Sequence, residues 1–260
     1  MKWIDKSSVS MNKPGKPGDQ DSLRLHVFMA RCGVGSRRHC EELIKEGRVA
    51  VNGEKVTLLG VKVRESDRIE LDGKMLSPVK EKFYIALHKP PGYLCSNYDK
   101  LDRPLALELI RFPLPTRLFH VGRLDFLSSG LIFYTNDGEF AQSVSHPSGQ
   151  IQKVYKVHTF ETVTEEALGQ YKKGVEIEGQ KYRLHSYRRI GDRMCLVTLV
   201  EGKNREIRKV LTYLGYRIKW IHRTRIGIVS IRGIEPGAWR FLTHDECEWF
   251  ISLKKPKFKQ

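Results

Sequence analysis

The arrangement of strands over residues 83–250 constrains the fold of this chain more than any other feature. Short apolar runs at 83–87 and 131–135 have the length of buried strands. Turn-forming residues follow both runs, Pro-Pro-Gly at 90–92 and Asn-Asp-Gly at 136–138. The strands do not alternate regularly with long helices, as a doubly wound parallel sheet requires. We therefore expect an α+β domain.

A smaller unit with a different pattern precedes this domain. Apolar residues at helical spacing after Leu23 predict one short helix, and Ser36 is a candidate N-cap for a second helix that ends at Gly47. Asn-Gly at 52–53 predicts a tight hairpin immediately afterwards. Residues 23–73 are thus expected to form a small helix–helix–hairpin domain.

Three further segments have the composition of arms and connections. Residues 1–22 mix Lys, Ser, Gly and Pro without periodicity, which predicts a flexible basic arm. Residues 74–82 read as a linker, and residues 251–260 as a solubilising Lys-rich tail. The expected catalytic or binding domain therefore covers residues 83–250.

Positive charge is concentrated in one part of the chain. The formal net charge is +16, and residues 181–225 hold thirteen Lys and Arg but only three acids, with Tyr and Trp interleaved. This stretch includes a predicted amphipathic helix over 204–214. Lys and Arg neutralise phosphates and aromatic rings stack on bases, so nucleic acid is the favoured partner. The alternative is a solvated basic face.

Several classes of protein have no support in the sequence. No apolar run approaches the roughly 18–20 residues of a membrane span, and the N-terminus lacks the apolar core of a secretory signal. The five scattered cysteines favour a reducing cytoplasm over a disulfide scaffold. Phosphate-loop, dinucleotide, zincin and serine-hydrolase motifs are absent, and the histidines form no ligand cluster. We expect a cytoplasmic protein without metal or cofactor.

Four polar segments stand at the ends of predicted strands. They are His-Lys-Pro-Pro-Gly-Tyr-Leu-Cys-Ser at 88–96, Gly-Arg-Leu-Asp-Phe-Leu-Ser-Ser-Gly-Leu at 122–131, Lys-Val-Tyr-Lys-Val at 153–157 and Glu-Gly-Lys-Asn-Arg-Glu-Ile-Arg at 201–208. In this order they resemble the motifs of the RsuA/RluB-type pseudouridine synthases. The smaller unit resembles the ribosomal-protein S-four type RNA-binding domain. The resemblance implies a catalytic domain with a mixed, largely antiparallel sheet and a central cleft.

The same resemblance implies three catalytic residues. Asp125 matches the essential aspartate, Arg208 matches the arginine that keeps this carboxylate ionised and in place, and Tyr155 matches the tyrosine that stacks on the target base. Physical arguments agree, because a carboxylate in a Ser/Gly-rich turn between apolar segments needs a cationic partner, and Arg can pair with it bidentately. An aromatic face offsets part of the cost of unstacking a uridine. Without the resemblance, Asp125 is equally well a turn residue and Tyr155 a core residue.

A second set of residues is expected to bind RNA. Arg37 and Arg38 fall in the first turn of a helix, where free N–H groups and the helix dipole favour a phosphate. The alternative for this unit is a helical hairpin that only packs on the larger domain. Lys89 and Arg123 are expected as phosphate binders or loop anchors rather than proton shuttles. The remaining candidates are Lys203, Asn204 and Arg205, whereas Asp137 is expected to form a turn.

The sequence departs from the family pattern at three places. Ser128 stands where Thr is common, and Lys209-Val210 stand where Arg-Met is common. Glu206 stands where Gln is common, which adds a negative charge that would weaken RNA contact or tune Arg208. None of these changes removes a catalytic group.

The function that the resemblance implies is isomerisation of one uridine to pseudouridine in ribosomal RNA by a monomeric enzyme. The motif at 88–96 favours the large-subunit (23S) RNA. The alternatives are a small-subunit (16S) or transfer RNA target, or a non-catalytic RNA-binding factor of ribosome assembly. A DNA-binding repressor is disfavoured, because a hairpin follows the helix pair and no dimerising segment is visible.

Overall fold

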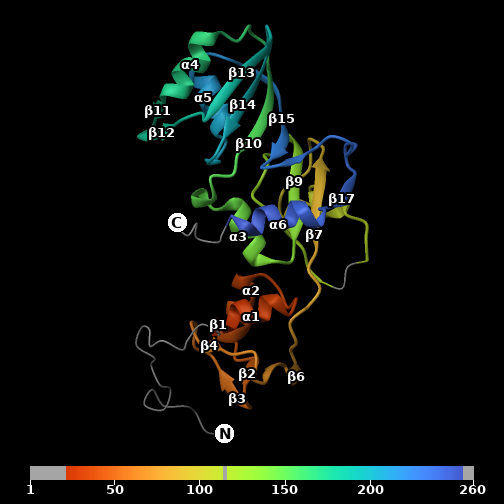
Figure 1. Cartoon of the computed structure of the whole chain (residues 1–260). Coiled ribbons are helices and arrows are strands. Elements are labelled where there is room, and N and C mark those ends of the chain that lie inside the picture. Colours follow the sequence, from red (N-terminus) through yellow and green to blue (C-terminus); the bar gives the residue numbers. More distant parts are fainter. Residues whose placement is uncertain (1–21, 114–115, 254–260) are drawn as a thin grey trace, which may run out of the picture. The chain divides into compact units, whose positions relative to one another are not determined.

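Residues 22–113 and 116–253 are described by the structure, a computed structural model (Figure 1). The chain divides between Lys80 and Glu81 into two units, each with its own core. The expected arm over 1–22 lies outside the described residues except for its last residue. The expected tail over 251–260 is described only to residue 253, and its first residues continue a helix.

The first unit begins with two short helices. Its elements are β1 (Leu23–Arg24), α1 (Leu25–Arg31), α2 (Arg37–Lys45), β2 (Val49–Val51), β3 (Glu54–Val56), β4 (Lys62–Val63), β5 (Ile69–Leu71) and β6 (Lys74–Met75). Ser36 caps α2 as expected, since its hydroxyl accepts a hydrogen bond from the backbone N–H of His39. Asn52 and Gly53 both have positive φ, at 53° and 84°, and they join β2 to β3 as the predicted hairpin turn.

A small antiparallel sheet, ordered β3-β2-β5-β6, completes the first unit. Apolar side chains of α1, α2 and the strands form its core, including Leu25, Phe28, Ile44 and Ile69. β6 occupies the first two residues of the segment expected to be a linker, because Lys74 pairs with Leu71 across a second tight turn. The connection between the units is accordingly shorter than expected.

The second unit is built on one mixed sheet. The strands are β7 (Tyr84–Lys89), β8 (Phe119–Val121), β9 (Ser129–Thr135), β10 (Lys153–Thr159), β11 (Val175–Ile177), β12 (Gln180–Tyr182), β13 (Ser186–Gly191), β14 (Met194–Leu199), β15 (Ile218–Ile226), β16 (Val229–Ser230) and β17 (Trp239–Phe241). The helices are η1 (Ala106–Leu109), α3 (Gly138–Ser145), η2 (Pro147–Gly149), α4 (Glu165–Lys173), α5 (Glu206–Tyr213) and α6 (His244–Ser252). The expected α+β class is confirmed.

The main sheet runs in the order β13-β14-β10-β15-β9-β7-β17, with β8 beside β9 and β16 beside β15. Among the described residues, neighbouring strands of this sheet pair antiparallel except for β9 with β15, which pair parallel. The expectation of a mixed, largely antiparallel sheet is therefore confirmed. The β11–β12 hairpin stands apart from this sheet.

Two cores cover the two faces of the sheet. Tyr155, Val157 and Ile221 face one core, to which α4 and α5 contribute Tyr171 and Leu211. On the opposite face, a second core contains side chains of β7, β9, α3 and α6, among them Ala86, Phe133, Phe140 and Phe250. Figure 1 shows α3 and α6 beside the β7–β9 half and α4 and α5 beside the β13–β14 half. Tyr155 reaches the site because it lies on the first of these faces.

The helix expected over 204–214 begins two residues later than predicted. Arg205 has a left-handed backbone, with φ of 51°, so residues 204–205 belong to the loop and α5 starts at Glu206. Apolar spacing predicts the body of a helix but carries no information on this irregular entry. The late start leaves Asn204 and Arg205 on a loop rather than on the helix.

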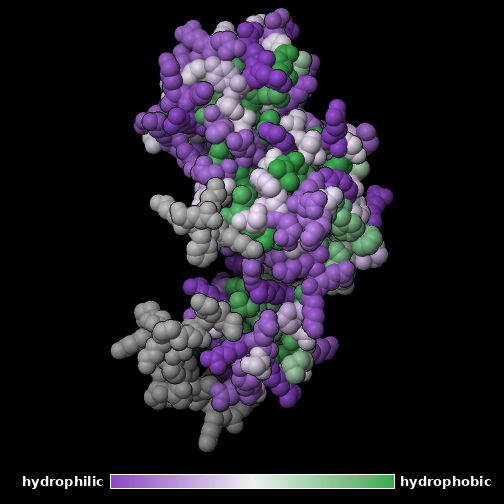
Figure 2. Space-filling view, viewed as in Figure 1, coloured by the Kyte–Doolittle hydropathy of each residue, from purple (hydrophilic) through white to green (hydrophobic). Residues whose placement is uncertain are grey.

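Polar residues cover most of the visible surface, and hydrophobic residues appear there only in small patches (Figure 2). Among the described residues, no helix is both long and apolar enough to cross a membrane.

The parallel junction of β9 and β15 generates a stability prediction. Gly130 has φ of +116°, and a Cβ on it would lie 2.3 Å from the backbone oxygen of Arg223. Gly130→Ala should therefore lower the free energy of unfolding by more than the about 1–2 kcal/mol that a left-handed alanine costs by itself. Chemical denaturation of the full chain measures this loss.

Gly179 supplies the matched control, because it has φ of +72° but nothing within 4 Å of an added Cβ. Gly179→Ala should lose only the backbone contribution. Equal losses for the two alanine variants would show that the strand contact is not what requires a glycine at residue 130.

Candidate active site

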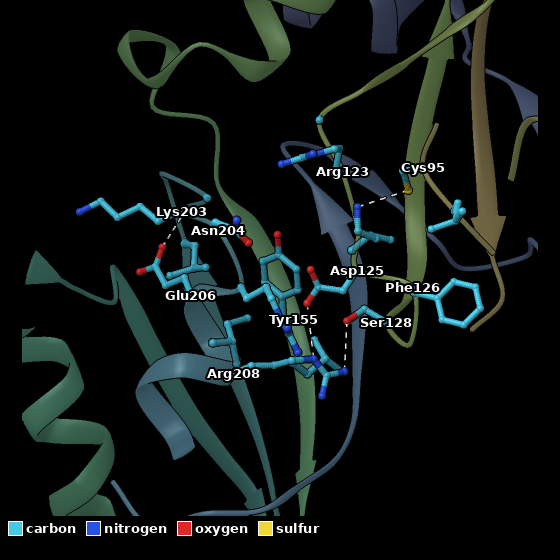
Figure 3. Close-up of a pocket in the computed structure, with 18 residues that line it drawn as sticks. Cys95, Arg123, Asp125, Phe126, Ser128, Tyr155, Lys203, Asn204, Glu206 and Arg208 are labelled. Carbon is cyan, nitrogen blue, oxygen red and sulfur yellow. Dashed lines mark hydrogen bonds and ion pairs between the residues drawn. The ribbon is translucent and has the colours of Figure 1, made fainter. Parts of the chain in front are cut away.

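A cleft of about 490 Å³ opens in the second unit on the face of the sheet that carries Tyr155 (Figure 3). Three segments distant in the sequence line it: the turn that leads into β9, the strand β10, and the loop that enters α5. The residues lining it include Cys95, Arg123, Asp125, Phe126, Ser128, Tyr155, Lys203, Asn204, Arg205, Glu206, Ile207 and Arg208. The cleft thus brings together the last three of the four polar segments and includes Leu94 and Cys95 of the first.

Asp125 and Arg208 form an ion pair inside this cleft. Nε of Arg208 lies 3.4 Å from Oδ2 of Asp125, and their side chains are 18% and 34% exposed. The contact is single rather than the bidentate fork expected, because Nη2 of Arg208 is directed to the hydroxyl of Ser128 at 3.4 Å. Figure 3 shows both contacts converging on the guanidinium. Partial burial makes this pair stronger than an exposed one, since water screens it less.

Backbone contacts hold the turn that carries Asp125. The N–H of Ser128 donates to the carbonyl of Asp125 at 3.0 Å, which closes the turn. The N–H of Gly92 donates to the carbonyl of Phe126 at 2.8 Å. The N–H of Leu124 is directed to the sulfur of Cys95 at 3.4 Å, and burial is the main reason that the pKa of this thiol is raised.

Lys89 also holds the turn that carries Asp125. It is fully buried, and its ammonium donates to the carbonyls of Ser128 at 2.6 Å, Pro90 at 2.8 Å and Phe126 at 3.3 Å. Burial lowers the pKa of Lys89 to about 8, although the nearby charge of Asp125 opposes this shift. Lys89 was expected to bind RNA or to anchor a loop. Because its ammonium reaches no solvent, this geometry favours the anchor and corrects the RNA-binding assignment.

Tyr155 lies on β10 with its ring in the cleft beside Asp125 (Figure 3). It is 92% buried by the surrounding strands, so its ring has one defined position rather than many. A planar ring beside a carboxylate is the arrangement that an aromatic base can enter and stack on. The structure therefore brings Asp125, Tyr155 and Arg208 together, as expected.

The loop before α5 is fixed by Glu206. This residue is buried, and its carboxylate accepts hydrogen bonds from the backbone N–H of Lys203 at 3.1 Å and the hydroxyl of Tyr171 at 3.3 Å. Burial raises the pKa of Glu206, although both partners act in the opposite direction. These partners are inside the protein, and neither of them is Arg208. The added negative charge is thus used to hold the loop.

The candidate RNA-binding residues fall into two groups. Arg123, Lys203, Asn204 and Arg205 line the cleft, and the ammonium of Lys203 extends away from Asp125 to the carbonyl of Lys181 (Figure 3). Arg37 and Arg38 are exposed in the first turn of α2 in the other unit. Asp137 lies outside the cleft and caps α3 by accepting from the N–H groups of Glu139 and Phe140.

One residue of the site escaped sequence reasoning. Arg223 is only 2% exposed, and its guanidinium is directed to the hydroxyl of Tyr155 at 3.4 Å. From the sequence it stood only among the thirteen basic residues of 181–225. In the structure, Arg223 stands two residues after Ile221 on β15, so both side chains point to the same buried face of the sheet. The described residues contain no cluster of three or more His, Cys, Asp or Glu side chains able to hold a metal ion.

Comparison with known proteins agrees with this geometry. The family model described as RNA pseudouridylate synthase matches residues 83–213, and that of the S4 domain matches residues 23–69. An uncharacterized RNA pseudouridine synthase of Borreliella burgdorferi is 40% identical over 82% of this chain and 87% of its own length. Ribosomal large subunit pseudouridine synthase B of Bacillus subtilis is 35% identical over 88% and 96%.

A solved structure extends the similarity to the fold. A pseudouridylate synthase crystal structure aligns with a TM-score of 0.65 and 28% identity, covering 88% of this chain and 99% of the other. The chain therefore belongs to the RNA pseudouridylate synthase family and carries an S4 domain ahead of its catalytic domain. The resemblance inferred from the four polar segments is confirmed.

Glu206 generates a prediction of pH-dependent stability. Its pKa is higher in the folded chain than in the unfolded chain, so the folded state binds more protons and stability falls as pH rises from about 4.5 through the folded pKa. Glu206→Gln keeps an acceptor for Lys203 and removes the buried charge. We expect a higher thermal midpoint at neutral pH, by about 2–4 °C per kcal/mol gained. The gain should disappear in acid.

Glu201→Gln is the matched control, because the Glu201 side chain is 55% exposed and pairs with Lys203 only at 4.0 Å. It should leave the thermal midpoint unchanged at either pH. A lower midpoint for Glu206→Gln at neutral pH would mean that the charged carboxylate stabilises the loop more than burial disfavours it.

Proposed function

We propose that this protein isomerises a single uridine of large-subunit ribosomal RNA to pseudouridine, with Asp125, Arg208 and Tyr155 as the residues that act on it. The observation that carries the proposal is the partly buried Asp125–Arg208 ion pair beside the ring of Tyr155. The large-subunit target is supported by the motif at residues 88–96 and by the name of the Bacillus subtilis relative.

The reaction conserves all atoms of the nucleotide. The bond between C1′ and N1 breaks, the uracil turns while it stays in the cleft, and a new bond joins C1′ to C5. The proton leaves C5 and N1 gains one, so no oxidant, reductant or leaving group is required. The chemistry needs a site that retains the detached base, and we assign that task to the stacking face of Tyr155.

Asp125 supplies the reactive carboxylate in this scheme. Two roles suit it: attack on the uracil ring, or removal of a ribose proton. Both roles use the carboxylate, and the guanidinium of Arg208 holds it in place from 3.4 Å. A hydrolytic glycosidase would instead need a second carboxylate to activate water. Asp125 is the only acidic residue besides Glu206 that lines the described cleft, and Glu206 is already bound to Lys203 and Tyr171.

The alternative of a non-catalytic RNA-binding factor explains less of the site. Such a factor would use the basic surface and the S4 domain, but it has no use for a carboxylate held in a cleft by a partly buried cation. For the proposed enzyme, we assign RNA contacts to Arg37, Arg38, Arg123, Lys203, Asn204 and Arg205. We further propose that it acts as a monomer in the cytoplasm and meets its RNA in a ribosome assembly intermediate.

Asp125→Asn tests the assignment of the catalytic carboxylate. The amide keeps the size of the side chain but loses its charge, so pseudouridine formation on unmodified ribosomal RNA transcripts should fall by about 10²–10⁴-fold or more. Asp137→Asn is the control, because this buried residue lies outside the cleft, where it caps α3 and pairs with Lys82, and an asparagine still caps a helix. Wild-type turnover by Asp125→Asn would refute the assignment.

Mapping pseudouridine in cells that lack the gene tests the RNA target. All ribosomal and transfer RNAs should be mapped, and one large-subunit signal should disappear. The wild-type gene should restore it, whereas Asp125→Asn should not. Loss of a signal only from small-subunit or transfer RNA would contradict the target while leaving the chemistry in place.

The S4 domain generates a separate prediction about salt. If Arg37 and Arg38 contact phosphates, changing both to Gln should weaken binding of ribosomal RNA and reduce the slope of log Kd against log salt by about 1 for each lost contact. Arg68→Gln is the control, since Arg68 already pairs with Glu70 at 2.6 Å. An unchanged slope in the double variant would show that these arginines do not bind phosphate.

A further inference from the structure

Arg223 occupies the middle of β15, where this strand separates β10 from β9. In the strand registers it stands opposite Tyr155 on one side and opposite Gly130 on the other. Its side chain is 98% buried. The residue therefore lies between the strand that carries the stacking ring and the strand that follows the Asp125 turn.

The guanidinium of Arg223 connects these two parts of the cleft. Nε donates to the carbonyl of Leu131 at 2.6 Å, and Nη1 is directed to the carbonyl of Arg123 at 3.5 Å. The two carbonyls flank the segment that contains Asp125. Nη1 also lies 3.4 Å from the hydroxyl of Tyr155, and the guanidinium carbon lies 5.9 Å from the centre of that ring.

Burying the Arg223 side chain in the core is energetically unfavourable. Among the described residues no carboxylate forms an ion pair with Arg223, and its Nη2 is buried without a hydrogen-bond partner. A buried charge of this kind opposes folding, and an apolar side chain of similar size would often be more stable. Packing alone thus does not explain why residue 223 is an arginine. Its contacts to Tyr155 and to the backbone around Asp125 explain it.

We propose that Arg223 is a positioning residue, which holds the ring of Tyr155 and the turn that carries Asp125 in one fixed arrangement. This inference rests on the proposed function, since it assumes that Asp125 and Tyr155 act on the uridine. Arg223 itself does not line the cleft, so it acts through these two residues. A rigid arrangement matters because a displacement of about 1 Å at a reacting group can cost about 10²-fold in rate.

The chemistry of the guanidinium suits this task better than that of an ammonium. Its planar fork lets separate nitrogens reach Leu131 on one side and both Arg123 and Tyr155 on the other. A lysine at this position would keep the charge but provides a single nitrogen. Such a lysine can keep some of these hydrogen bonds, but it cannot bond to Leu131 and to Arg123 and Tyr155 in the same geometry.

The test compares Arg223→Met and Arg223→Lys with the wild type in the full chain. Release of tritium from ribosomal RNA transcripts labelled at C5 of uridine measures turnover, and filter binding measures affinity for the same RNA. We expect Arg223→Met to lower kcat by about 10²-fold with little change in KM or RNA affinity. Arg223→Lys should fall between Arg223→Met and the wild type.

A double-mutant cycle with Tyr155→Phe separates positioning from a general loss of structure. If Arg223 acts partly through the Tyr155 hydroxyl, the double variant should lose less activity than the product of the two single losses. Arg240→Met is the control for removing a partly buried arginine, since Arg240 pairs with Glu246 outside the cleft. It should lower the thermal midpoint without changing kcat.

Three results would overturn the inference. The first is a wild-type kcat in both Arg223 variants. The second is a fall in the activity of Arg223→Lys that is fully explained by a smaller folded fraction of that variant. The third is a double variant whose loss of activity equals the product of the two single losses. A wild-type chain that releases no tritium from any ribosomal or transfer RNA would instead refute the proposed function. The two failures are therefore distinguishable.

Discussion

The close approach of β9 and β15 is the contact on which the cleft depends. Gly130 meets the backbone of Arg223 there, with no room for a Cβ between the strands. Because the turn with Asp125 leads directly into β9, this parallel junction fixes where that turn ends. β15 also lies against β10, so the same junction sets the distance from Asp125 to the ring of Tyr155.

Buried charge is the second theme of the site. Lys89 donates to carbonyls of the Asp125 turn, Arg223 donates to carbonyls on either side of that turn, and Glu206 accepts from the loop that enters α5. Each of these groups loses hydration on folding, which opposes stability. Their hydrogen bonds fix the conformation of loop segments that lie outside the regular strands and helices. The cleft is therefore lined by loops whose geometry is as fixed as that of the sheet.

Local signals in the sequence predicted much of the fold. Ser36 as a helix cap, Asn52-Gly53 as a hairpin turn and the α+β class all depend on short-range or pattern effects that a single sequence displays. The meeting of Asp125, Tyr155 and Arg208 came from motif resemblance, since residues 30 to 83 positions apart carry no local signal of contact. For Lys89 the sequence left open a phosphate binder or a loop anchor, and it did not single out Arg223 at all. Charged residues are exposed by default, and only the tertiary structure shows that both are buried and donate to backbone carbonyls in or beside the Asp125 turn.

The thiol of Cys95 affects how the folded protein reacts with thiol-directed reagents. It lies against the backbone of the catalytic turn, and burial raises its pKa together with those of Cys32, Cys195 and Cys247. The thiolate is the form that attacks disulfides, alkylating agents and oxidants, and at neutral pH these side chains hold very little of it. Thiol-directed probes would accordingly label the unfolded chain far faster than the folded one, which makes them reporters of folding rather than of catalysis.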